Sequence, residues 1–162
     1  MKVQNLSLEL IERFLAQKRI AMVGISREPN SFSVALFNEL CRQGYDVVPV
    51  NPKAPSLYGR HCFAQVQDIH PPVTAALLMT SPEVTETVVA DCFAAGIAIV
   101  WMYGATGKGA VSPHASAFCK AHGMEVIPGQ CPFMFLPNVS GIHRFHGFVR
   151  KISGTYPRRL AA

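Results

Sequence analysis

The chain has 162 residues, of which 49% are hydrophobic and 15% are charged. This length predicts one domain over residues 1–162, with enough apolar side chains for a single full-sized core. The apolar runs, such as 75–79 and 97–103, are too short to cross a bilayer, so we expect no membrane span. Acidic residues interrupt the apolar stretch near the N-terminus, which is untypical of a signal peptide.

The charge is distributed unevenly. Residues 1–125 hold ten Lys/Arg and ten Asp/Glu, so the formal net charge of +5 lies entirely after Glu125. A basic tail on a neutral body argues against a nucleic-acid binder, whose folded surface would be basic throughout. The tail predicts an amphipathic helix at about 140–153 that docks on the sheet or on a second subunit of a homo-oligomer. Contact with an acidic protein partner or a membrane surface is the alternative. Its cations are Arg144, Arg150, Lys151, Arg158 and Arg159.

Five cysteines, at positions 41, 62, 92, 119 and 131, form no C-x-x-C pair. An odd number without such a pair favours reduced thiols, as in a cytoplasmic protein. The six histidines show no zinc-ligand spacing, and we expect no metal site.

Apolar runs alternate with helical patterns along the chain. Serines precede several helical patterns as candidate N-caps, and glycines follow them. Helices are expected at 6–17, 33–44, 81–96 and 112–123. Strands are expected at 20–25, 46–51, 74–80, 97–102 and 124–129, with a short one at 61–63.

This alternation predicts an α/β fold, a Rossmann-like doubly wound parallel sheet of about five strands with helices on both faces. In such a sheet the ligand binds at the carboxyl ends of the strands, near the point where strand order reverses. The strand ends are Gly24–Pro29, Asn51–Lys53, Thr80–Pro82, Met102–Lys108 and Gly129–Pro132.

The turn after the first strand departs from the dinucleotide-binding pattern. G-x-G-x-x-G would place glycines at 26 and 29, where this chain has Ser26 and Pro29. A helix N-terminus here attracts an anion, and Gly24 lets a phosphate come close. Ser26, Ser31 and Ser33 offer hydroxyl donors and Arg27 offers a charge. The alternative, left open, is that the serines only cap the helix and Arg27 only meets water.

The end of the second strand bears on which nucleotide would bind. An NAD site needs an acid there, but the chain reads Asn51, Pro52, Lys53. Asp46 is expected at the opposite end of this strand. A lysine at the strand end suits a ribose phosphate, as in NADP or coenzyme A, although a solvated lysine remains the alternative.

The stretches "VGISREPNSFS", "GYDVVPVNPK", "LYG", "DI", "VW" and "CP" follow one another as in the coenzyme-A-binding domain proteins. The resemblance covers about 18–132 and extends to the CoA-binding domain of the succinyl-CoA synthetase alpha subunit. It implies CoA or an acyl-CoA bound across the strand ends. It places Gly24, Ser26 and Arg27 at the pyrophosphate with Ser33 close behind, Asn51, Pro52 and Lys53 beside the adenosine and its 3′-phosphate, and Thr80, Ser81 and Pro82 along the pantetheine path.

The thiol end of such a ligand is less well defined. Tyr103 stands where the family pattern has glutamine, and Lys108 lies in a glycine-rich loop that is no Walker motif. Cys131 follows the last strand and is the one candidate nucleophile, with a buried structural cysteine as the alternative. No paired carboxylates are expected at the strand ends, so we predict a non-catalytic carrier or regulatory protein. The alternatives are an NADP-dependent reductase on the same fold and a ligand-free interaction protein that acts through its basic C-terminal helix.

Overall fold

The computed structural model describes residues 7–104 and 109–138 of the chain. Its centre is a five-stranded parallel sheet in the order β2-β1-β5-β6-β7. The strands are β1 (Arg19–Val23), β2 (Asp46–Val50), β5 (Ala75–Leu78), β6 (Ile99–Tyr103) and β7 (Glu125–Gln130). The chain moves from β1 outward to β2 and then returns to β5 on the other side of β1. Strand order therefore reverses between β1 and β5, as predicted for a doubly wound sheet.

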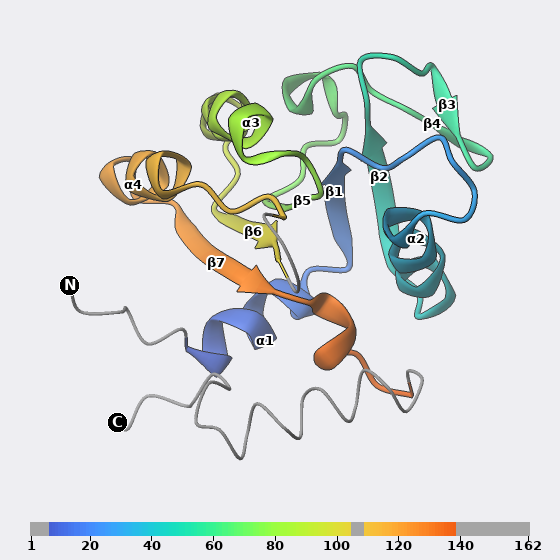
Figure 1. Cartoon of the computed structure of the whole chain (residues 1–162), viewed down its shortest axis with the longest axis horizontal. Coiled ribbons are helices and arrows are strands. Elements are labelled where there is room, and N and C mark those ends of the chain that lie inside the picture. Colours follow the sequence, from blue (N-terminus) through green and yellow to red (C-terminus); the bar gives the residue numbers. More distant parts are fainter. Residues whose placement is uncertain (1–6, 105–108, 139–162) are drawn as a thin grey trace.

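Helices cover both faces of the sheet (Figure 1). The helices are α1 (Leu8–Ala16), α2 (Phe32–Arg42), α3 (Pro82–Ala94) and α4 (Pro113–Ala121). Alternate residues of each strand point to opposite faces, which gives two cores. Trp101 and Ile20 lie in the core under α1 and α2, whereas Val100 and Ala21 lie in the core under α3 and α4. The predicted Rossmann-like fold is confirmed.

The serine caps are also where the sequence places them. Ser7, Ser81 and Ser112 each precede a helix and accept a hydrogen bond from an N–H of its first turn. Helix α2 begins at Phe32, so its N-cap is Ser31 and Ser33 lies within the first turn. These caps satisfy N–H groups that otherwise have no helical partner.

The connection between β2 and β5 differs from the sequence prediction. In place of one strand at 61–63, β3 (Ser56–Leu57) and β4 (Arg60–His61) form a small antiparallel hairpin. Phe63 makes an isolated parallel bridge with Val50. Two short 3-10 helices, η1 (Val66–Asp68) and η2 (Pro132–Met134), complete the described residues. The hairpin brings residues of this connection next to the carboxyl edge of the sheet.

No disulfide joins the five cysteines, all of which lie in the described residues. Burial between α3 and α4 raises the pKa of Cys92 to about 12 and that of Cys119 to about 11. These two thiols are packed as small apolar groups. Among the described residues, no helix is long and apolar enough to cross a membrane.

Candidate functional site at the carboxyl edge of the sheet

Gly24 follows β1 and touches both neighbouring strands. Its φ is +87°, and a Cβ added there would lie 2.9 Å from Thr80 Cγ2 and 3.1 Å from the Met79 carbonyl carbon. On the other side, the Gly24 N–H donates to the Val50 carbonyl over 3.2 Å. The site therefore requires a glycine for backbone geometry and packing, in addition to the close approach of a phosphate that the sequence predicts.

The serines after Gly24 hold the turn in shape. The Ser26 N–H donates to Ser33 Oγ over 2.9 Å, and the Glu28 N–H donates to Ser26 Oγ over 3.0 Å. Ser31 Oγ accepts from the Val34 N–H at 3.4 Å and lies 3.2 Å from Ser33 Oγ. Ser33 is buried, and its hydroxyl holds the Ser26 backbone from the interior of the protein. The bond from the Val34 N–H supports the capping interpretation for Ser31, whereas Ser33 lies within the first turn of α2 and holds the Ser26 backbone.

Asn51 links the end of β2 to the same turn. Its Nδ2 donates to the Ile25 carbonyl over 3.3 Å, and its Oδ1 accepts from the Lys53 N–H over 2.9 Å. Pro52 and Lys53 are exposed beyond it. The amide thus fixes the backbone that carries Lys53 beside the β1 turn.

The β3–β4 hairpin supplies a contact that the sequence did not predict. Tyr58, at the hairpin tip, donates its hydroxyl to the Ser26 carbonyl over 2.9 Å. Its ring centroid lies 6.0 Å from that of Phe37 on α2. The "LYG" stretch contains Tyr58, but a tyrosine between strands carries no signal for the residue that it contacts.

Thr80 and Ser81 close the other side of the turn. Thr80 lies against Gly24, and its hydroxyl is 2.7 Å from that of the buried Thr85 on α3. Ser81 caps α3 and is exposed, while Pro82 occupies the first helical turn. The structure therefore brings the three predicted segments together, with the β1 turn between Asn51 and Thr80.

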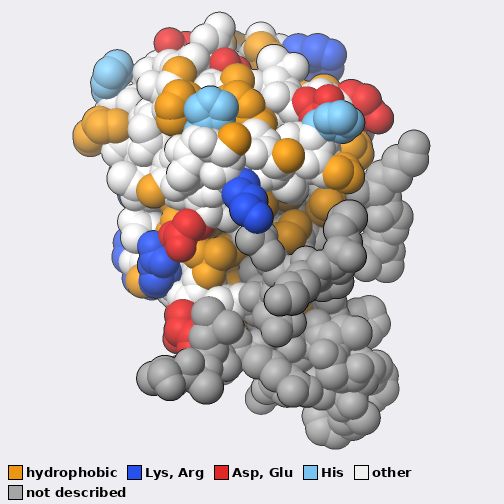
Figure 2. Space-filling view, turned by 90° about the vertical axis from the view of Figure 1, so that its left-hand side faces the viewer, with side chains coloured by type: hydrophobic (Ala, Val, Ile, Leu, Met, Phe, Trp, Pro, Cys, Tyr) orange, Lys and Arg blue, Asp and Glu red, His pale blue; other side chains and the backbone are white. Residues whose placement is uncertain are grey.

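Two cations stand at this edge. Arg27 and Lys53 are exposed, and neither forms an ion pair within residues 7–104 and 109–138. On the face that Figure 2 shows, charged side chains of both signs are scattered, with no continuous basic patch in the described part. Arg27 and Lys53 therefore both stand at the carboxyl edge without a counter-ion among the described residues.

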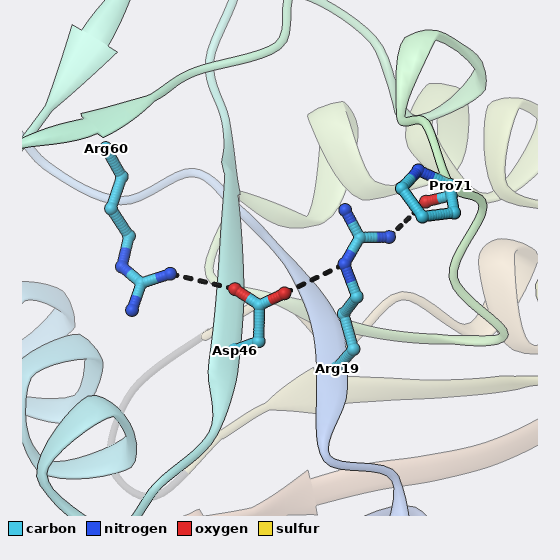
Figure 3. Close-up of polar contacts among 4 residues, drawn as sticks. All are labelled: Arg19, Asp46, Arg60 and Pro71. Atoms are coloured by element: carbon cyan, nitrogen blue, oxygen red, sulfur yellow. Dashed lines mark hydrogen bonds and ion pairs between the residues drawn. The ribbon is translucent and has the colours of Figure 1, made fainter.

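Asp46 lies at the amino edge, as predicted. Its carboxylate binds Arg19 Nε at 2.9 Å and Arg60 Nη1 at 2.8 Å, and Arg19 also donates to the Pro71 carbonyl (Figure 3). An acid held there cannot reach a ribose at the opposite end of β2. Within the described residues, no group of His, Cys, Asp and Glu side chains could hold a metal ion.

Tyr103 and Cys131 meet where β6 and β7 end. Burial raises the pKa of Tyr103, and the nearby Cys131 thiol raises that pKa further. Cys131 is only 4% exposed, which limits its access to an attacking or accepting group. Lys108 and the predicted C-terminal helix at about 140–153 lie outside the described residues.

Comparisons with known proteins identify a family and similar folds. The CoA binding domain family matches residues 18–137. The chain is 26% identical over 130 residues to "Uncharacterized protein YneT" of Bacillus subtilis, covering 80% of this chain and 93% of the relative. A hypothetical protein from Pyrococcus horikoshii OT3 superposes with a TM-score of 0.73 and 28% identity, over 82% of this chain and 91% of the other.

A larger enzyme contains a similar domain. The dinucleotide forming acetyl-coenzyme A synthetase 1 of Ca. Korarchaeum cryptofilum, solved with phosphate and ADP, superposes with a TM-score of 0.62 and 25% identity. The match covers 74% of this chain but only 27% of the synthetase chain. Because the family match spans most of the chain and these structures share its fold, the chain belongs to the CoA binding domain family.

Proposed function

We propose that the protein binds coenzyme A, or an acyl-CoA, at the carboxyl edge of the sheet and acts as a non-catalytic carrier or regulatory protein. One observation carries the proposal: the β1 turn touches Asn51 on one side and Thr80 on the other. Three segments that are far apart in sequence thus form one continuous surface at the reversal of strand order, where ligands of this fold class bind.

The charges of this surface suit the nucleotide end of CoA. CoA carries a pyrophosphate and a 3′-phosphate, whose oxygens are negatively charged and accept hydrogen bonds. Arg27 lies in the β1 turn, five residues before α2 begins at Phe32, and the dipole of that helix also favours an anion near its N-terminus. Lys53 lies at the end of β2, beside the expected adenosine position. We assign the pyrophosphate to the turn and the 3′-phosphate to Lys53.

Calorimetric titration with CoA and dephospho-CoA tests this assignment. We expect dephospho-CoA to bind the wild-type protein at least roughly tenfold more weakly, because a charge-assisted contact contributes about 1.5–3 kcal/mol. Lys53→Ala should remove that difference. Lys120→Ala, which changes an exposed lysine on α4, is the matched control and should preserve it.

The outcomes separate the proposal from its alternatives. Equal affinity for CoA and dephospho-CoA would remove Lys53 from the 3′-phosphate site. NADP binding in the absence of CoA binding would favour the NADP-dependent reductase, because Lys53 suits the ribose phosphate of NADP equally well. If neither nucleotide binds, the proposed function is wrong and an interaction protein without a ligand is favoured.

A further inference from the structure

Gln130 carries a buried oxygen without a partner. It is the last residue of β7 and is 7% exposed. Its Oε1 is buried, and no donor among the described residues lies within hydrogen-bond distance. Folded proteins rarely leave a buried polar atom in this state, because the atom has lost its hydrogen bonds to water without gaining others. The oxygen therefore points to a donor that comes from outside the described residues.

The backbone of Gln130 is fixed in place. Its carbonyl accepts from Trp101 Nε1 over 3.0 Å and from the Gly104 N–H over 3.4 Å. Gln130 is paired with Tyr103 across the β6–β7 ladder, after a register shift in which β7 gains a residue. With its main chain held in this way, the side chain is confined to the carboxyl edge.

Aromatic rings lie next to this position. The Tyr103 ring centroid is 5.0 Å from that of Phe32, which is 5.5 Å from that of Phe133. Phe32 is the first residue of α2 and is 37% exposed. Figure 1 shows β7 running directly into the η2 segment that carries Phe133. The ends of β6 and β7 thus combine one unmatched acceptor with an apolar aromatic surface.

The chemistry of this surface differs from that of the β1 turn. At the turn, Arg27 and Lys53 suit phosphates. At Gln130 an acceptor needs a donor, and phosphate oxygens are not donors at neutral pH. Outside its adenosine, the donors of CoA all lie in the pantetheine arm, which has two amide N–H groups, one hydroxyl and a weakly donating thiol. β7 lies three strand spacings, about 14 Å, from β1, a span that a linear pantetheine arm can cross.

We propose that Gln130 Oε1 accepts a hydrogen bond from an N–H or O–H group of the pantetheine arm of CoA, with Phe32 and Tyr103 in contact with the arm beside it. The proposal rests on the proposed function. It makes Gln130 a binding residue for the arm that distinguishes CoA from other phosphorylated adenosine nucleotides. In this arrangement the ligand supplies the hydrogen bond that the described residues do not.

The test compares CoA with adenosine 3′-phosphate 5′-diphosphate, which lacks the pantetheine arm, by calorimetry. Gln130→Met keeps the side-chain length and removes the acceptor. We expect CoA affinity to fall about tenfold, because the pantetheine donor is then buried without a partner, while affinity for the truncated nucleotide stays the same. The melting temperature of the unliganded protein should rise, because the variant no longer buries an unmatched oxygen. Gln67→Met, which changes an exposed glutamine of η1, is the matched control and should leave both affinities unchanged.

Each other result overturns the proposal. Unchanged CoA affinity in Gln130→Met, or an equal loss for both ligands, assigns Gln130 a structural role. A lower melting temperature with an unchanged ratio of affinities identifies a structural water as the missing donor. Gln130→Asn retains the amide, but its shorter side chain moves the oxygen away from the pantetheine arm. This variant provides the same comparison of the two ligands if Gln130→Met does not fold. Failure of the wild-type protein to bind either ligand would instead refute the proposed function, on which this inference depends.

Discussion

Charged side chains at the two edges of the sheet differ in whether they form ion pairs. At the amino edge, Asp46 binds Arg19 and Arg60, so an acid and two bases from β1, β2 and β4 satisfy one another. At the carboxyl edge, Arg27 and Lys53 form no ion pair with any described residue. Both edges are formed by the same five strands, so the difference arises from the side chains and not from the fold.

We infer from this difference that the charged residues of the amino edge contribute to stability, whereas Arg27 and Lys53 at the carboxyl edge are available for binding. Ion pairs between exposed groups contribute modestly to the free energy of unfolding, but at the amino edge they tie the β3–β4 hairpin to the sheet. Cations without a counter-ion contribute nothing of this kind and are available to an anionic ligand. We therefore expect amino-edge substitutions to change stability alone, and carboxyl-edge charge substitutions to change affinity alone.

The largest expected effect concerns a carboxyl-edge residue that breaks this simple division. Gly24→Ala should destabilise the protein by about 2–4 kcal/mol, because a left-handed backbone and a Cβ collision with Thr80 and the Met79 backbone act together. CoA binding should weaken as well. Urea denaturation measures the first effect and calorimetry the second.

Gly44→Ala is the matched control for that substitution. Gly44 has a similar φ of +88°, but an added Cβ there would meet no atom within 4 Å. It should therefore lose only the conformational contribution, about 1–2 kcal/mol, and keep its CoA affinity. Equal losses of stability at the two glycines would show that the close contact of Gly24 with Met79 and Thr80, just after β5, does not add to the cost of the substitution.

A smaller effect is expected at the amino edge. Asp46→Asn removes two ion pairs and should lower the free energy of unfolding by about 0.5–1.5 kcal/mol, since exposed pairs contribute roughly 0.2–1 kcal/mol each. The loss should shrink at high salt, where such pairs are screened. CoA affinity should not change, and a change would contradict the separation of the two edges.

The smallest effect on stability is expected for Arg27→Ala. Arg27 is exposed and has no ion-pair partner among the described residues, so the free energy of unfolding should stay within about 0.5 kcal/mol of wild type. CoA should nevertheless bind more weakly, and the remaining affinity should depend less steeply on salt concentration. Denaturation curves measure the stability, and CoA titrations at two salt concentrations measure the affinity. A large loss of stability, or an unchanged CoA affinity, would contradict the prediction.

Local sequence patterns were sufficient for the four described helices and the five strands of the parallel sheet, but not for the β3–β4 hairpin or the two 3-10 helices. The pairs Ser81-Pro82 and Ser112-Pro113 mark helix starts because a cap hydroxyl and a fixed φ act within one turn. Asp46 could be assigned to the amino edge because strand direction follows from the alternation of strands and helices. For α2 the pattern was ambiguous, since Ser31 and Ser33 both precede apolar residues, and the fold uses Ser31 as the cap.

The sequence by itself thus determined the fold class, the strand ends at the carboxyl edge and the segments that follow them. Tertiary structure alone decided which of those segments touch: Gly24 with Thr80, Asn51 with the Ile25 carbonyl, and Tyr58 with the Ser26 carbonyl. It also left Gln130 Oε1 buried without a donor among the described residues. The physical reason is range, because caps, turns and periodicity act over a few neighbouring residues, whereas these contacts depend on how separate strands and loops pack in space.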